Sequence, residues 1–186
     1  MLELHNVTIE PLIHSLSLTV GDRQLVCLTG SQGTGKSTIL RAVLGLIPVN
    51  SGHISIDGEL LTPRSAPYFR RHIAYVPQRL TAIEDYDSMA DISELLFGLR
   101  VNKGGASYKV PTDGRRWSEL SADERYLLLL SNALQLGKSL VIVDEPAEPI
   151  SAETMEQVDR MLVDAARHGA TVLAVNSRIL QNQIRL

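Results

Sequence analysis

Eight consecutive residues near the N-terminus have the types and the spacing that bind phosphate. Residues 30 to 37 read Gly-Ser-Gln-Gly-Thr-Gly-Lys-Ser, which fits the pattern GxxxxGK[ST]. Glycines let such a loop curl until its backbone N–H groups point at phosphate oxygens. Lys36 would place a positive charge beside the β- and γ-phosphates, and Ser37 would offer a hydroxyl to Mg²⁺. A chance match in a glycine-rich turn is the weaker alternative, so the loop predicts binding of a nucleoside triphosphate. The residues expected to contact the nucleotide are Gly30, Ser31, Gln32, Gly33, Thr34, Gly35, Lys36, Ser37 and Thr38.

Two adjacent carboxylates follow a second apolar run. Leu140 to Val143 is typical of a buried strand, and it ends in Asp144 and Glu145. Beside a phosphate loop, Asp144 would orient the water shell of Mg²⁺ and Glu145 would polarise an attacking water. Taken alone, the same residues could equally cap the loop that follows. Together with the phosphate loop, they favour hydrolysis of the bound nucleotide.

The elements that must position these residues alternate between strands and helices. The apolar run Leu25 to Thr29 precedes the loop, and the helical spacing of Ile39 to Leu46 follows it. The positive end of that helix would then point at the phosphates. We expect further strands at 53–56, 73–76 and 171–175, and further helices at 121–136 and 152–168. Alternating buried strands and helices predict an α/β fold with a mainly parallel sheet.

Two other regions have patterns of their own. Apolar residues alternate through residues 1–29, which predicts short strands, and Asp57-Gly58 signals a hairpin. From about 79 to 118 the pattern weakens into short helical pieces, such as Asp91 to Leu99. We expect an inserted helical subdomain there. Cys27 falls inside the strand before the phosphate loop, where a buried core thiol is expected.

Composition excludes several classes of protein. The 186 residues, 44% of them apolar and 21% charged, suit one globular domain. A net charge of −3 without a basic cluster argues against a nucleic-acid partner. No apolar segment approaches 18 residues and the N-terminus lacks a signal core, so any link to a membrane is expected to run through a partner protein. A single cysteine excludes a disulfide framework or a zinc cluster and fits a reducing compartment.

These motifs together resemble the nucleotide-binding cassette of ABC-type ATPases over nearly the whole chain. Gly30 to Thr38 is similar to the family's Walker A loop, and Val141 to Pro146 to its Walker B motif with the catalytic glutamate. Ile73 to Gln78 resembles the strand that delivers the Q-loop glutamine, and Leu120 to Arg125 stands where the LSGGQ signature opens a helix. The resemblance implies a P-loop NTPase fold with a mainly parallel core sheet, a small N-terminal antiparallel β part and an inserted helical subdomain. It implies a single ABC-like ATP-binding domain over residues 1–186.

The resemblance also implies ligands, roles and partners. ATP and Mg²⁺ would be bound, with Lys36, Gln78 and Glu145 catalytic and with Ser37, Gln78 and Asp144 at the metal. Ser121 would contact ATP held by a second cassette subunit in a homo- or heterodimer. A membrane permease subunit would contact Gln78 and residues 79–87. That partner would hold the chain on the cytoplasmic side, at the inner face of the cell membrane.

Several positions depart from the family pattern. No aromatic residue stands near Pro11 to stack on adenine, so either His14 would pack there or the packing would be weaker. A carboxylate at Asp123 in the signature would repel the γ-phosphate that this segment should clasp. The other departures are Ala122 and Glu124 in the signature, Ser151 for the D-loop aspartate and Ser177 for the H-loop histidine. Both composite sites of a dimer would be impaired, which predicts slow hydrolysis. Because the chain ends soon afterwards, we expect a minimal cassette.

Three functions remain open at this point. The first is an ATP-binding subunit that slowly hydrolyses Mg-ATP to drive a membrane transporter. The second is a nucleotide-gated regulatory or assembly partner with little hydrolysis, which the altered signature favours. The third is a P-loop small-molecule kinase, which fits the length but not Asp144-Glu145-Pro146 or the absence of an arginine-rich lid. No residue identifies a transported substrate or a direction of transport.

Overall fold

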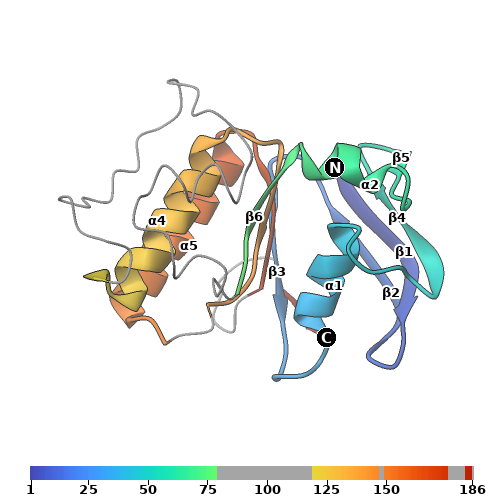
Figure 1. The fold of residues 1–186 in the computed structure, drawn as a ribbon, viewed down its shortest axis with the longest axis horizontal. Coiled ribbons are helices and arrows are strands. Elements are labelled where there is room, and N and C mark those ends of the chain that lie inside the picture. The colour runs from blue at the N-terminus through green and yellow to red at the C-terminus, as the bar shows by residue number, and fades with distance from the viewer. Residues whose placement is uncertain (79–118, 147–148, 176–182, 186) are drawn as a thin grey trace.

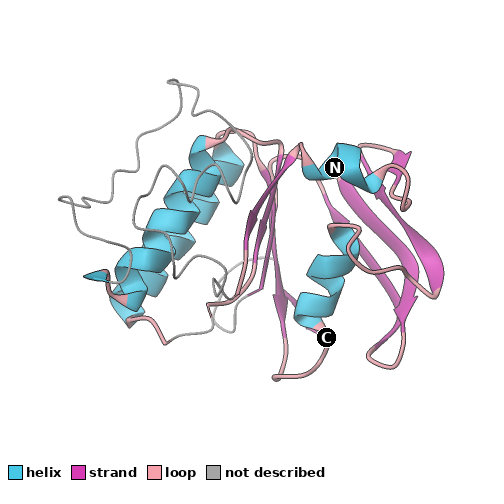
Figure 2. Ribbon diagram, viewed as in Figure 1, coloured by secondary structure: helices cyan, strands magenta, loops and turns pink. Residues whose placement is uncertain are grey.

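The computed structural model of the protein describes residues 1–78, 119–146, 149–175 and 183–185. Their strands form two sheets, one antiparallel with the order β2-β1-β4-β5 and one parallel with the order β6-β7-β8-β3-β9 (Figures 1 and 2). The strands are β1 (Leu2–Ile9), β2 (Ile13–Val20), β3 (Leu25–Thr29), β4 (Ser51–Ile56), β5 (Glu59–Leu60), β6 (Ile73–Val76), β7 (Leu140–Val143), β8 (Thr171–Val175) and β9 (Gln183–Arg185). The helices are α1 (Lys36–Val43), α2 (Ala66–Arg70), α4 (Ala122–Gln135) and α5 (Ala152–Arg167).

Strands β6, β7 and β8 of the parallel sheet are covered on both faces, which explains why they are almost entirely apolar. In β7, Leu140 and Ile142 pack into the core shared with α1 and the antiparallel sheet. Val141 and Val143 alternate with them and pack against α4 and α5 on the opposite face. Figure 1 shows this layering, with α4 and α5 side by side on one face of the parallel sheet and α1 between the two sheets.

Helix α1 is the element that both sheets enclose. Ile39 and Leu40 have no exposed surface, and burial of each such side chain stabilises the fold by about 1.5–3 kcal/mol. Gly45 follows the helix with a φ of 65°, the left-handed conformation that ends many helices. The phosphate-loop helix is therefore anchored in the core, and its first turn is held at a fixed place beside the parallel sheet.

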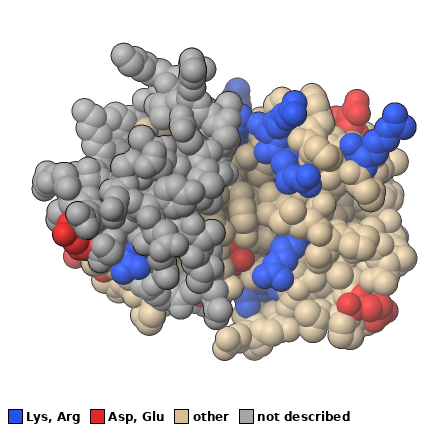
Figure 3. All heavy atoms as spheres, viewed as in Figure 1, with Lys and Arg blue, Asp and Glu red and all other residues tan. Residues whose placement is uncertain are grey.

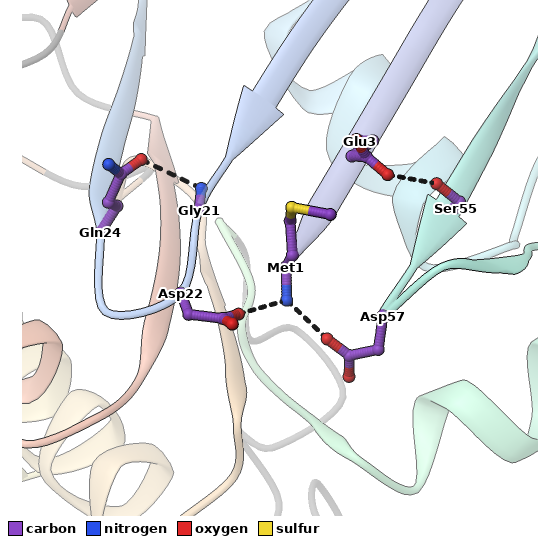
Figure 4. Close-up of polar contacts among 7 residues, drawn as sticks. All are labelled: Met1, Glu3, Gly21, Asp22, Gln24, Ser55 and Asp57. Atoms are coloured by element: carbon purple, nitrogen blue, oxygen red, sulfur yellow. Dashed lines mark hydrogen bonds and ion pairs between the residues drawn. The ribbon is translucent and has the colours of Figure 1, made fainter.

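Polar contacts at one end of the molecule join the antiparallel sheet to the turn before β3. The Met1 nitrogen lies 2.5 Å from Asp22 Oδ1 and 2.5 Å from Asp57 Oδ1, so it bridges that turn and the β4–β5 hairpin (Figure 4). Within the turn, the backbone N–H of Gly21 donates to the side chain of Gln24 at 3.0 Å. These contacts fix how β1 lies relative to the strand that leads into the phosphate loop.

Most predicted elements are confirmed. Strands β6, β7 and β8 have the predicted bounds, and Asp57-Gly58 turns the β4–β5 hairpin. The loop helix is Lys36–Val43 and not Ile39 to Leu46, because its N-cap is Gly35 in the loop and Gly45 takes a left-handed φ before Leu46. Strand β4 begins at Ser51, two residues before the predicted start. No sequence pattern predicts α2 or β9. The expected helical subdomain at 79–118 lies outside the described residues. No helix within the described ranges has both the length and the apolar character that a membrane span requires.

Candidate active site

The phosphate loop joins β3 to α1 through backbone conformations that favour glycine. Gly33 and Gly35 have φ values of 86° and 93°, in the left-handed region. A Cβ on Gly35 would lie 2.7 Å from Ile13 Cδ1, whereas one on Gly33 would meet no atom within 4 Å. Gly35 is also the N-cap of α1, without a side-chain cap bond, and the first turn of α1 carries no acidic residue. The helix thus presents uncapped backbone N–H groups to the space in front of the loop.

The Lys36 side chain folds back and binds the start of the phosphate loop. Its Nζ donates to the backbone carbonyls of Gly30 and Ser31, each at 2.8 Å. The Thr34 hydroxyl donates to the Ser31 carbonyl at 3.0 Å. An ammonium has three N–H donors, and those two carbonyl bonds use two of them. The ammonium is therefore held at the mouth of the loop, where a bound phosphate would meet it.

Ser37 and Asp144 connect the loop helix to the end of β7. The Ser37 hydroxyl donates to Asp144 Oδ1 at 3.1 Å, and the backbone N–H of Glu145 donates to the same oxygen at 3.0 Å. Asp144 is buried, and burial raises the pKa of its carboxyl above the ordinary 3.8. The two hydrogen bonds and the positive charge of Arg41 lower this pKa and only partly offset burial.

One cavity of about 650 Å³ brings these groups together, a volume typical of small-molecule sites. Gln78, Asp144 and Val175 reach it from the carboxyl ends of β6, β7 and β8, the edge where open parallel sheets bind ligands. Its lining comprises Leu12, Gly30, Gln32, Gly33, Gly35, Lys36, Ser37, Thr38, Gln78, Asp144, Glu145, Pro146 and Val175. The cavity thus combines the phosphate loop, the two adjacent carboxylates and the candidate Q-loop glutamine.

Three residues that line this cavity have donor groups that fit Mg²⁺. Ser37 offers a hydroxyl, Gln78 an amide oxygen and Asp144 a carboxylate, and Mg²⁺ prefers such oxygen ligands. The Ser37–Asp144 hydrogen bond already holds two of the three side chains within reach of each other. A cation there would also favour the charged form of the buried Asp144 carboxylate.

Two residues of the β1–β2 hairpin bear on the expected contact with the nucleobase. His14 is not among the residues that line it, and its Nε2 instead lies 3.2 Å from the Pro11 carbonyl. Leu12, which the sequence analysis does not single out, lines the cavity with 47% of its surface exposed. The hairpin between β1 and β2 therefore presents an aliphatic side chain to the cavity. No motif marks this residue. Only the structure identifies it, because the β1–β2 turn places Leu12 beside Gly35.

The altered signature forms hydrogen bonds within the chain. Ser121 accepts from the N–H of Glu124 at 3.2 Å, and Glu124 accepts from the N–H of Ser121 at 2.8 Å, which makes a capping box. Asp123 Oδ1 accepts from the backbone N–H of Ser151 at 2.7 Å. Ser121 is not among the residues lining the cavity of its own chain. The H-loop position Ser177 lies outside the described residues, as does the first part of the D-loop at 147–148.

A glycine-rich loop before a buried helix, with paired carboxylates after a neighbouring parallel strand, defines a P-loop nucleotide-binding fold. Comparisons with known proteins agree. Residues 13–148 match the family model of the ABC transporter. The chain is 30% identical to the manganese transport system ATP-binding protein MntB of Bacillus subtilis, over 94% of this chain and 76% of the relative. It is 28% identical to the zinc transport system ATP-binding protein TroB of Treponema pallidum, over 90% of this chain and 67% of the relative.

A solved structure with the same fold is the dimeric structure of MJ0796, a bacterial ABC transporter cassette. It superposes with a TM-score of 0.77 at 21% identity, covering 96% of this chain and 88% of the other. The chain therefore belongs to the ABC transporter family, and its fold is that of the family's ATP-binding cassette, an ATPase.

Proposed function

We propose that this chain binds Mg-ATP in the cavity before α1 and hydrolyses it slowly to drive a membrane transporter. The observation that carries the proposal is the shared cavity. It joins the phosphate loop, Gln78 and the pair Asp144 and Glu145 at the ends of adjacent strands. These groups can hold a triphosphate, a divalent cation and an attacking water at one place.

Binding rests on the loop and on the uncapped start of α1. Backbone N–H groups from Gly33 to Ser37 would cradle the β-phosphate, and the helix dipole would favour the anion. Lys36 would exchange contacts with loop carbonyls for contacts with the β- and γ-phosphates. Bound Mg²⁺, held by Ser37, Gln78 and Asp144, would neutralise phosphate charge.

Hydrolysis rests on Glu145. Glu145 lines the cavity next to Asp144, where its carboxylate would accept a proton from the attacking water. The Asp144 carboxylate holds the backbone of Glu145 by accepting a hydrogen bond from its N–H. Gln78 enters the cavity from β6, so it can orient water and metal together. The aliphatic wall at Leu12 would contact the nucleobase without aromatic stacking.

Slow turnover follows from groups outside this cavity. Asp123 and Glu124 place two carboxylates in the first turn of α4, the segment that would face ATP bound by a second cassette subunit. Ser177 would replace the histidine that contacts the γ-phosphate. The same carboxylates favour a second candidate function, a nucleotide-gated regulatory or assembly partner with little hydrolysis.

The partners proposed are a second cassette subunit and a membrane permease subunit. They would place a single ATP-binding domain, residues 1–186, at the inner face of the cell membrane. A nucleic-acid partner is not proposed. In Figure 3 basic and acidic side chains both occur on the drawn face, with uncharged surface between the groups.

The test is turnover of Glu145→Gln beside the wild type. Loss of the general base should lower kcat by about 10²-fold while the Kd for Mg-ATP stays within about twofold. Phosphate release measures kcat, and calorimetry measures Kd. The control is Glu153→Gln, because Glu153 is an exposed carboxylate in the first turn of α5 that does not line the cavity.

Three results would overturn the transporter proposal. An unchanged rate in Glu145→Gln would remove the assigned base. Tight Mg-ATP binding without measurable wild-type turnover would favour the regulatory function. Transfer of phosphate to an added small-molecule acceptor would favour a kinase.

A further inference from the structure

The connection that carries Glu145 is held at both ends by the same helix. This connection runs from Asp144 at the end of β7 to Ser151 before α5, and the structure describes it at residues 144–146 and 149–151. At its start, the Tyr126 hydroxyl donates to the Asp144 carbonyl at 2.9 Å. At its end, Asp123 accepts from the Ser151 N–H at 2.7 Å. Both contacts therefore come from the first half of α4.

The two holding residues are three positions apart, so they lie on one face of α4. Tyr126 is only 6% exposed, and its ring packs in the core between α4, α5 and the parallel sheet. The Asp144 main chain is fixed on its other side as well, because its N–H donates to the Val76 carbonyl of β6 at 2.9 Å. The start of the connection is thus tied to β6 and to α4 together.

The other end is tied through two helix caps. Ser121 and Glu124 cap α4 reciprocally, which fixes the helix turn that holds Asp123. Ser151 caps α5 by accepting the N–H of Thr154 at 3.1 Å, while its own N–H donates to Asp123. The Asp123 carboxylate therefore joins the N-termini of α4 and α5, both positive ends of helix dipoles.

We infer that Asp123 and Tyr126 are positioning residues for Glu145. Tyr126 holds the main chain directly before Glu145, and Asp123 holds Ser151 six residues further along, so that Glu145 keeps its place in the lining of the cavity. The inference rests on the proposed role of Glu145 in hydrolysis. In this inference the Asp123 carboxylate supports hydrolysis in its own subunit. Repulsion of a partner's nucleotide by the same carboxylate would only slow hydrolysis.

The proposed slow turnover invokes repulsion between Asp123 and a partner's nucleotide, and positioning of Glu145 predicts the opposite sign for substitutions at Asp123. These substitutions therefore decide which of the two effects controls the rate. Asp123→Ala removes the acceptor and should lower kcat by about 3- to 10-fold, with the Kd for Mg-ATP unchanged. Asp123→Asn keeps an acceptor oxygen and should restore most of the rate. Repulsion predicts instead that both variants raise the rate. Glu153→Ala is the matched control, since it removes a carboxylate from the first turn of α5 without touching the Ser151 bond.

Tyr126→Phe tests the other end with the ring left in the core. Loss of the hydroxyl should also lower kcat by about 3- to 10-fold without changing the Kd for Mg-ATP. Unchanged kcat in both Asp123→Ala and Tyr126→Phe would overturn the inference. So would higher kcat in Asp123→Ala and Asp123→Asn.

Hydrogen exchange gives a readout that does not depend on turnover. The amides of residues 149–152 should exchange faster in Asp123→Ala than in the wild type, Asp123→Asn or Glu153→Ala. Equal exchange in all four would overturn the inference even if the enzyme hydrolyses ATP. Faster exchange in Asp123→Ala, together with a rate that Glu145→Gln leaves unchanged, would locate the failure in the proposed function of Glu145. The inference that Asp123 and Tyr126 position Glu145 for hydrolysis would then be wrong as well, because it rests on that role.

Discussion

The N-termini of α1 and α4 both offer backbone N–H groups to an anion, but their surroundings differ. Each has backbone N–H groups without helical partners and the positive end of a helix dipole. At α1, Gly35 makes no side-chain cap bond and the first turn has no acidic residue. At α4, Ser121 and Glu124 close a capping box, and Asp123 adds a second carboxylate. The start of α1, where we propose that phosphate binds, is thus distinguished by the carboxylates it lacks as well as by its glycines.

The charges beside the two ends follow the same division. Lys36 brings a cation to the start of α1, held by two loop carbonyls. Asp123 brings an anion to the start of α4, where it accepts the N–H that begins α5. We propose that the N-terminus of α1 attracts a phosphate. At the N-terminus of α4, the carboxylates of Asp123 and Glu124 already supply negative charge. Substitutions at either end should therefore act on different properties.

The largest effect is expected from removing the cation at α1. Lys36→Ala should weaken Mg-ATP binding by about 10²-fold or more, because charge-assisted bonds to phosphate are among the strongest polar contacts. Calorimetry gives the Kd directly. The matched control is Lys138→Ala, since Lys138 also donates to a backbone carbonyl, that of Arg71 at 2.8 Å, but lies outside the cavity. Equal losses in both variants would contradict the role given to Lys36.

The next effect tests the backbone of the open helix end. Gly35→Ala should cost about 2–4 kcal/mol of unfolding free energy, because it combines a left-handed φ with a Cβ 2.7 Å from Ile13 Cδ1. Gly33→Ala has a similar φ but no atom within 4 Å, so about 1–2 kcal/mol is expected. Denaturant unfolding measures both. A larger loss in Gly33→Ala would mean that the loop packs differently.

Much of this arrangement can be predicted from sequence, and the reason lies in local signals. The strands β6, β7 and β8 are short apolar runs that polar residues, glycine or proline end sharply, so their bounds follow from the pattern. The phosphate loop and Asp144-Glu145 are contiguous motifs. Parallel strands then bring them to one edge of the sheet.

What cannot be predicted depends on contacts between distant parts of the chain. Asp123 and Ser151 are 28 residues apart, and no sequence pattern shows that they meet. Strand β9 includes Gln183 and Arg185, polar residues that give no buried-strand signal, and it is recognised only by its pairing with β3. Helix α2 has five residues with a proline in its first turn, too few for helical periodicity. Leu12 lines the cavity only because a hairpin brings it beside Gly35.

The buried carboxylate of Asp144 predicts how the stability of the fold depends on pH. Burial raises the pKa of Asp144, so the folded chain holds this proton more tightly than the unfolded chain does. Stability contributed by this group is therefore lost as pH rises from 3.8 through the folded pKa. Asp144→Asn should be more stable than the wild type at pH 7, although Mg-ATP binding is weakened.

Denaturant unfolding across pH checks this sign. The advantage of Asp144→Asn should shrink as pH falls through the folded pKa, because the wild-type carboxyl becomes neutral too. A stability loss in Asp144→Asn at pH 7 would mean that the hydrogen bonds to the carboxylate outweigh its burial.

The smallest effect is expected at the closed end, α4. Ser121→Ala removes one half of the capping box and should cost about 1 kcal/mol of unfolding free energy. Mg-ATP binding by the isolated monomer should not change, because Ser121 does not line its own chain's cavity. A fall in monomer affinity in calorimetry would contradict the division between the two helix ends.

The most direct test of that division is hydrogen exchange of the Glu145→Gln variant with and without Mg-ATP, in dilute solution where light scattering shows a monomer. The account predicts that amides of residues 33 to 38 gain protection, while those of Ser121 and Glu124, already paired by the capping box, stay unchanged. Protection at Ser121 and Glu124 without protection at residues 33 to 38 would contradict it.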